Sequence, residues 1–234
     1  MKESLELSKV VLLGRTFEEY TRYFDLKADD LGEKKILDVA SGVSSFCAEA
    51  NAQGFHATAL DPIYSWSPEE IKKHCEHDLE FVLREIEGVK AYKWDFYKSA
   101  EGLRKYRERA YRMFLPDLAK AKGSRYIFGK LPDAPFYDGE FDLTLVSYFL
   151  FVYEEQLDYE FHQQALAELL RITTGEVRIY PLVNFKGERS KLIDRIKMDS
   201  AFAGWNFEEV ETDFEFLRNS NSFLKIRKLN TAGR

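Results

Sequence analysis

The sequence predicts a single α/β domain in which helices cover both faces of a mostly parallel β-sheet. Residues 36–39 and 56–60 are short apolar runs, typical of buried parallel strands, and a helical segment separates them. Later apolar runs at 126–128, 143–146 and 176–182 alternate with stretches of helical period. With 234 residues and 45% hydrophobic content, the chain is long enough to bury one such core.

The first two strands and the helix between them form one unit that ends in a carboxylate. Small residues fill the turn at 40–45, the helix covers 46–53, and Gly54 stops it. Asp61 and Pro62 close the second strand. Small residues let a ligand approach the backbone, and a helix that starts at such a turn directs free N–H groups at it. Because ligands of open α/β sheets bind beyond the carboxyl ends of strands, we expect a ligand site here.

The layout of this unit resembles that of class I S-adenosylmethionine (SAM) dependent methyltransferases. In that family an acid ends the first strand and opens the pattern Asp-x-Gly-x-Gly-x-Gly. The matching residues here are Asp38, Ala40, Gly42 and Ser44, so one of three glycines remains and the replacements are small. The resemblance implies that Asp61 binds the ribose hydroxyls of SAM. A carboxylate with two acceptor oxygens suits two vicinal hydroxyls.

A second region, residues 131–153, resembles the stretch of the same family that leads into the fourth strand. Ala134-Pro135-Phe136 and the turn at 138–142 match its two parts, and the strand follows at 143–146. The resemblance implies that adenine lies near this loop. Lys130 stands where an acid is expected, so Asp133 or the backbone of Leu131 would replace that contact.

The resemblance implies a Rossmann-like sheet in the order 3-2-1-4-5-7-6, closed by an antiparallel hairpin of strands 207–216 and 222–227. It implies SAM as cofactor and S-adenosylhomocysteine (SAH) as product. The turn also resembles that of a bacterial group of assigned methyltransferases without a named substrate. The expected cofactor-binding residues are Tyr20, Asp38, Ala40, Ser41, Gly42, Ser44, Asp61, Pro62, Leu131 and Ser147.

Three other interpretations stay open at this point. A nicotinamide dinucleotide fold needs G-x-G-x-x-G after the first strand, and this turn lacks that spacing. The second interpretation is a Rossmann-like sheet with a small-residue turn that binds no ligand. The third is a non-catalytic methyltransferase-like protein, favoured by the loss of two turn glycines and of the acid before the adenine loop.

Methyl transfer needs alignment of donor and acceptor more than a fixed catalytic residue, and no catalytic motif stands out. An Asn-Pro-Pro-Tyr type motif is absent after the fourth strand, which favours a small-molecule acceptor over DNA adenine or protein glutamine. Tyr148, Tyr153 and His162 are candidate groups near the active face. We expect His162 on the surface of its helix, and Tyr180 either in the acceptor pocket or in the core.

Composition excludes several classes of protein. The net charge of −6 argues against bulk nucleic-acid binding. The apolar runs are too short for a membrane span, and the charged start lacks the core of a signal peptide, so we expect a cytoplasmic protein without membrane contact. Cys47 and Cys75 suggest neither a zinc site nor a disulfide. We interpret residues 74–78, which contain His, Cys, Glu and Asp, as a solvated helix face and expect no metal.

Helices are expected at 3–26, 67–88, 157–172 and 188–202. The first has Thr16 as its cap and Glu19 at the position of a capping box, and it would bring Arg15 and Tyr20 to the cofactor.

The single domain, residues 1–234, carries an insert at about 91–125 that a minimal methyltransferase lacks. The insert begins with aromatic residues and continues as an amphipathic helix that Pro116 breaks or kinks. It is either a substrate lid or a solvated helix packed on the core. Its basic face comprises Arg104, Lys105, Arg107, Arg109 and Arg112.

Overall fold

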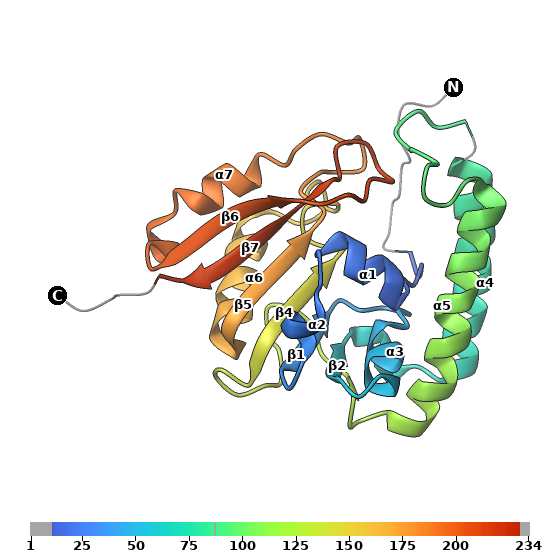
Figure 1. Ribbon diagram of the computed structural model, residues 1–234, viewed down its shortest axis with the longest axis horizontal. Helices are drawn as coiled ribbons and strands as arrows, with labels where there is room; N and C mark the ends of the chain where they lie inside the picture. The colour runs from blue at the N-terminus through green and yellow to red at the C-terminus, as the bar shows by residue number, and fades with distance from the viewer. Residues whose placement is uncertain (1–10, 87, 230–234) are drawn as a thin grey trace.

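The computed structural model describes residues 11–86 and 88–229, and within them seven strands form one mixed sheet (Figure 1). The strand order is β3-β2-β1-β4-β5-β7-β6, which confirms the order expected from the sequence. The first five strands are parallel, and β7 runs antiparallel to both β5 and β6. The strands are β1 (Lys35–Val39), β2 (His56–Leu60), β3 (Tyr126–Ile127), β4 (Phe141–Ser147), β5 (Thr173–Tyr180), β6 (Trp205–Glu211) and β7 (Ser222–Lys228).

Helices cover both faces of the sheet. The α-helices are α1 (Phe17–Tyr23), α2 (Ala28–Leu31), α3 (Phe46–Ala52), α4 (Pro68–Ile86), α5 (Ala100–Ala121), α6 (Tyr159–Ile172) and α7 (Leu192–Lys197), with 3₁₀ turns at η1 (Pro62–Ser65) and η2 (Ser200–Phe202). Buried side chains of α1, α3, α4 and α5 share one apolar cluster, and those of α6 and α7 share another. The sheet is therefore the middle of three layers.

Alternation along the strands decides which layer each side chain joins. Ile36 of β1 belongs to the cluster on the α1 and α3 side, whereas Leu37 and Val39 belong to the cluster on the α6 side. Because successive strand residues point to opposite faces, Asp38 faces the α1 side. All four side chains are at most 1% exposed, so Asp38 is a carboxylate inside the core.

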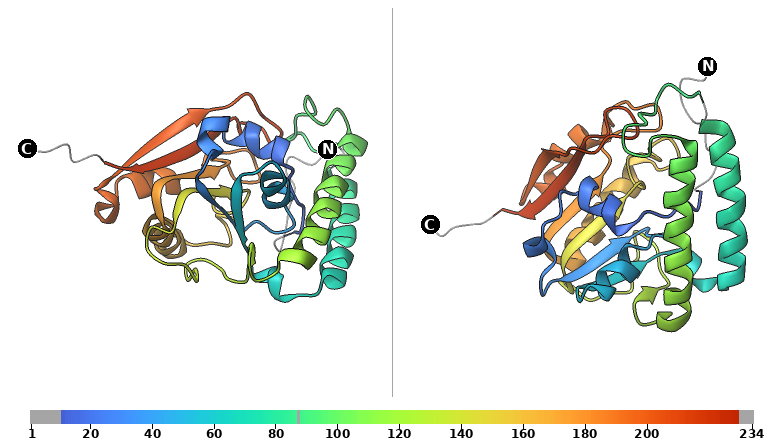
Figure 2. Two further views of the ribbon diagram at one scale, coloured as in Figure 1. Left: turned by 60° about the horizontal axis from the view of Figure 1, so that its bottom comes forward. Right: turned by 45° about the vertical axis from the view of Figure 1, so that its right-hand side comes forward.

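Helices α4 and α5 lie side by side at the end of the molecule opposite the C-terminal hairpin, in all views (Figures 1 and 2). The insert is thus α5 with its flanking loops, and it packs along the preceding helix. Leu103, Phe114 and Leu118 of α5 are at most 3% exposed, which shows that the apolar face expected from the sequence is buried.

The local signals at the helix starts are confirmed. The Thr16 hydroxyl accepts from the backbone N–H of Glu19, and the Glu19 carboxylate accepts from the N–H of Thr16 at 2.7 Å, which completes the capping box. At the start of α4, the Ser67 hydroxyl and the Glu70 carboxylate make the same exchange.

Three expected helix features are wrong or incomplete. The expected helix 3–26 begins at Phe17 in the described residues, and residues 11–16 run along a cavity without helical structure; residues 1–10 lie outside the described part. Helix α5 passes through Pro116 and ends five residues later, because the buried side chains around it hold the last turns on the core. The expected helix 188–202 is shortened to α7 and η2. No helix of the described residues is both long and apolar enough to cross a membrane.

Candidate functional site

A cavity of about 540 Å³ lies along the carboxyl edge of β1, β2 and β4. Its remaining walls come from the segment before α1, from α1, α4, α5 and α6, from the loop before α5, and from loops that follow β3, β4, β5 and β6. The size is within the usual range for small-molecule sites. Of the ten expected cofactor-binding residues, those that line the cavity are Tyr20, Ala40, Ser41, Gly42, Asp61, Pro62, Leu131 and Ser147.

Asp61 is the carboxylate that borders the cavity at the end of β2. Its two oxygens accept from the backbone N–H groups of Gly42, at 2.8 Å, and Ile63, at 2.9 Å. A carboxylate has about four acceptor positions, so about two remain for a ligand. Burial raises the pKa of Asp61 to about 6, and the two N–H groups oppose that rise.

Asp38 and Ser44 do not line the cavity but lie directly behind residues that do. The Asp38 carboxylate accepts from the Tyr20 hydroxyl at 2.9 Å and from the Ser41 hydroxyl at 2.6 Å. Burial raises its pKa to about 7, against the two hydroxyl hydrogen bonds, and nearby Asp61 adds to the rise. Asp38 therefore orients two cavity residues. Its expected contact with a cationic ligand stays a prediction.

The turn between β1 and α3 offers fewer free N–H groups than the sequence suggested. The N–H of Gly42 donates to Asp61, that of Ser44 to the carbonyl of Ser41, and that of Ser45 to the carbonyl of Arg15. The N–H of Phe46 donates to the Ser44 hydroxyl. A pyrophosphate needs several free donors and no facing carboxylates, so this turn is a poor dinucleotide site.

The ends of β1 and β4 both adopt a left-handed backbone at non-glycine residues. Ala40 has φ of 53° and Tyr148 has φ of 52°, both at the cavity. Such conformations cost energy in L-residues and often mark functional sites. Beside Tyr148, the Ser147 hydroxyl is buried and has no hydrogen-bond partner in the described structure. An unsatisfied buried hydroxyl on a cavity wall suits a ligand polar group.

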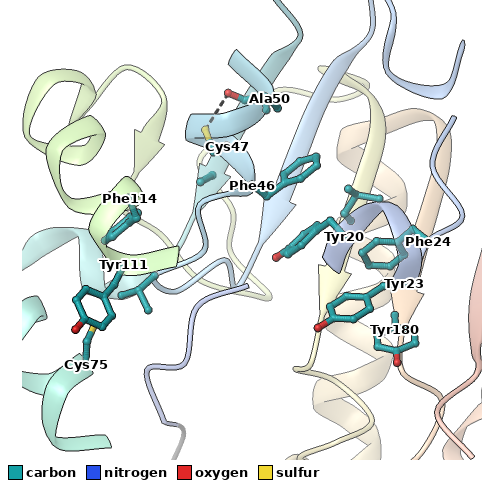
Figure 3. Packing of buried hydrophobic residues seen from close by; sticks show 14 of the residues in the cluster. Tyr20, Tyr23, Phe24, Phe46, Cys47, Ala50, Cys75, Tyr111, Phe114 and Tyr180 are labelled. Atoms are coloured by element: carbon teal, nitrogen blue, oxygen red, sulfur yellow. Dashed lines mark hydrogen bonds between the residues drawn. The ribbon is translucent and has the colours of Figure 1, made fainter. Parts of the chain in front are cut away.

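The half of the cavity beyond β4 is aromatic. Rings from four different segments line it, and burial raises the pKa of Tyr153 to about 12 and also raises that of Tyr148. Both phenols therefore stay protonated at neutral pH and can act as hydrogen-bond donors to a ligand. Tyr180, by contrast, is 1% exposed and stacks on Tyr23 with ring centroids 4.5 Å apart, so it belongs to the core (Figure 3).

The insert is attached to α1 by a buried ion pair and to the segment before α1 by a hydrogen bond. Arg107 of α5 donates to the Glu19 carboxylate, to the Tyr97 hydroxyl and to the carbonyl of Gly14, and it is 3% exposed. Burial alone would raise the pKa of Glu19, but Arg107 and Arg15 hold it below its ordinary value.

Arginines elsewhere on α5 also have partners. Arg104 pairs with Glu80, and Arg112 pairs with Glu108. The insert walls the cavity through Leu103 and Arg107, and its role as a substrate lid stays a prediction.

Several residues lie elsewhere than the sequence suggested. His162 is 1% exposed rather than on the surface, because its ring nitrogens face the carbonyls of Asp158 and Leu150. Asp133 does not line the cavity, so of the two replacements for the adenine contact only Leu131 is in place. Among residues 11–86 and 88–229, no group of three or more His, Cys, Asp or Glu side chains is arranged to hold a metal.

Two kinds of cavity residue were missed by sequence reasoning. Asp78 belongs to residues 74–78, which were expected to form a solvated helix face. Its side chain is instead 3% exposed, accepts from the backbone N–H of Leu12 at 2.9 Å and lines the cavity. Its place one turn after Cys75 on the apolar stripe was the available signal. Phe185 and Phe216 reach the cavity from late loops, and no local pattern marks them.

Comparison with known proteins shows the family. The protein MJ0045 of Methanocaldococcus jannaschii, described as uncharacterized, is 42% identical over 226 residues, which are 96% of this chain and 99% of that protein. No protein-family model matches the chain.

Similar solved structures are more distant. PH0226 of Pyrococcus horikoshii is 15% identical, with a TM-score of 0.43 over 90% of this chain and 86% of that one. A SAM-dependent methyltransferase of Aquifex aeolicus is 14% identical, with a TM-score of 0.40 over 90% of this chain and 87% of that one. Magnesium protoporphyrin IX methyltransferase of Synechocystis, with bound SAM, is 11% identical, with a TM-score of 0.45 over 91% of this chain and 78% of that one.

At such TM-scores the assignment of the fold rests on the strand order and on the reversed β7. The chain belongs to the family of MJ0045, and it has the fold of the class I SAM-dependent methyltransferases.

Proposed function

We propose that this protein transfers a methyl group from SAM to a small-molecule acceptor. One observation carries the proposal: the Asp61 carboxylate is fixed by two backbone N–H groups at the carboxyl end of β2, with acceptor positions left over beside the cavity. A ligand with two adjacent hydroxyls matches those positions. Gly42, Leu131 and Ser147 border the same space.

The charges of the site also favour a cationic ligand. Asp38 and Asp61 both have raised pKa values, and burial is the largest cause in each. In the described residues neither carboxylate has an ion-pair partner, so a positive charge nearby would stabilise their ionised forms. SAM carries a sulfonium and an ammonium group, whereas a dinucleotide pyrophosphate would add like charge.

SAM supplies a methyl group already activated by its sulfonium. The chain itself then has to hold the acceptor in line and exclude water. Because the pKa values of Tyr148 and Tyr153 are raised, both hydroxyls stay protonated at neutral pH. They can donate hydrogen bonds to a ligand, but they are not available as bases. The proposed acceptor atom is therefore one that is largely deprotonated at neutral pH, or one that releases its proton to solvent.

Calorimetric titration with SAM and SAH tests the proposal. We expect micromolar binding, and Asp61→Asn should weaken it by about 1.5–3 kcal/mol, the worth of charge-assisted hydrogen bonds. The matched control is Asp138→Asn, an exposed acid that pairs with Arg171 away from the cavity. Thermal melting checks that both variants fold.

Unchanged SAH affinity in Asp61→Asn would refute the ribose assignment. A folded wild-type protein that binds neither compound would refute the proposed function. SAM binding without methyl transfer to any acceptor in a broad screen would favour a non-catalytic methyltransferase-like protein.

A further inference from the structure

Arg15 places a guanidinium on the wall of the cavity. It lies one residue before the cap of α1, and its guanidinium carbon is 4.4 Å from the centre of the Tyr148 ring. One terminal nitrogen donates to the carbonyl of Leu13, and its Nε is buried without a hydrogen-bond partner in the described structure. Because Arg15 is half-buried and lines the cavity, its planar guanidinium is a candidate contact for a ligand.

Arg15 also lacks a counter-ion. Among residues 11–86 and 88–229, no carboxylate lies within ion-pair distance of it. Glu19, a candidate one turn away, accepts from Arg107, and it also accepts from Thr16 and from the hydroxyls of Tyr23 and Tyr97. Arg107 therefore takes this carboxylate, and the guanidinium of Arg15 has no ion-pair partner among the described residues. Burying that charge without a partner is costly, so an anion is the complementary ligand.

The position of this charge is fixed by the turn that forms the other half of the cavity. The carbonyl of Arg15 accepts from the N–H of Ser45 and from the hydroxyl of Ser44, both at 2.9 Å. Gly14 packs so closely on the carbonyl of Val43 that a Cβ would lie 2.1 Å from that oxygen. The guanidinium is thus held in a set relation to the proposed cofactor site.

The surroundings of Arg15 select a flat ligand. Its guanidinium lies over the Tyr148 ring, and the Tyr148 ring packs edge-on against Tyr23 and Tyr180. Rings favour stacked or edge contacts with another ring. The aromatic residues of this half are Tyr92, Tyr148, Phe149, Tyr153, Phe185 and Phe216.

We infer that the aromatic half of the cavity binds a planar aromatic acceptor bearing a carboxylate or similar anionic group, and that Arg15 binds that anion. The inference rests on the proposed function and names its substrate class. A carboxylate could also come from the methionine end of the cofactor. The experiment has to separate these two sources.

The test uses full-length protein saturated with SAH, titrated with 2-naphthoate and with its neutral isostere 2-naphthamide. We expect naphthoate to bind at least about tenfold tighter, because one partner of each hydrogen bond is charged. Arg15→Met should bring the ratio to about one, and Arg15→Lys should retain part of it. The matched control is Arg22→Met, on α1, whose guanidinium lies over Phe96 and which does not line the cavity.

Equal affinities of wild-type protein for the two naphthyl compounds would overturn the inference. A second arm compares SAH with 5′-methylthioadenosine, which lacks the carboxylate. If Arg15→Met weakens the binding of SAH but not that of 5′-methylthioadenosine, Arg15 binds the cofactor carboxylate and the inference is wrong. If wild-type protein binds no SAH, the proposed function fails, and the naphthoate preference of the protein without SAH still decides the role of Arg15.

Discussion

The pH dependence of stability should be controlled by the two buried carboxylates at the cavity. Asp38 is fully buried, and its pKa rises from 3.8 to about 7 on folding. The folded state therefore holds a proton that the unfolded state has lost, and stability falls as pH rises from about 4 through 7. Asp61, with a folded pKa of about 6, changes stability in the same direction.

The size of the effect follows from these values. Between about pH 5 and about pH 8, the ionisation of Asp38 should lower the free energy of unfolding by about 2–3 kcal/mol, and that of Asp61 by about 1–2 kcal/mol. The perturbation is Asp38→Asn, which keeps the shape and cannot ionise. Its amide oxygen can accept from one of the two hydroxyls of Tyr20 and Ser41, and its NH2 group can donate to the other, as the protonated acid does. Relative to wild type, the variant should therefore gain about 2–3 kcal/mol over that interval.

Urea denaturation at the two pH values measures this gain directly. Asp138→Asn is the control, because that carboxylate is exposed. Parallel pH dependences for wild type and Asp38→Asn would refute the argument, since they would mean that Asp38 is ionised in the folded state at no cost. SAH should also bind more tightly as pH rises from 5 to 8, because donors on the ligand favour ionised Asp61.

Two further variants test how the segment before α1 is held. Arg107→Met should destabilise the protein by about 3–5 kcal/mol in urea, because it leaves Glu19 buried and unpaired, whereas Arg112→Met in an exposed pair should change little; equal losses would contradict the assigned role of Arg107. Gly14→Ala should lower the unfolding free energy by about 1–3 kcal/mol through its clash with Val43; an unchanged melting temperature would show that the segment moves away freely.

Local patterns in the chain were sufficient for most of the strands and helices, and the resemblance supplied the strand order. The apolar runs at 36–39 and 143–146 became central parallel strands, because strands in the middle of a parallel sheet are covered on both faces and favour such buried segments. The Thr16 and Glu19 capping box needs only neighbours in sequence, and it formed as expected. Asp61 reached the cavity edge because a strand end fixes its place once the sheet forms.

Contacts between distant segments were beyond reach of such patterns. Whether residues 11–16 continue a helix depends on donors from the β1–α3 turn, and Ser44 and Ser45 take the Arg15 carbonyl instead. The charge that Arg15 presents depends on Arg107, 92 positions later, which occupies Glu19. Periodicity records which residues are apolar and which face they share. Ion-pair partners and cavity walls depend on how the helices and loops pack together, and periodicity along the chain does not show those contacts.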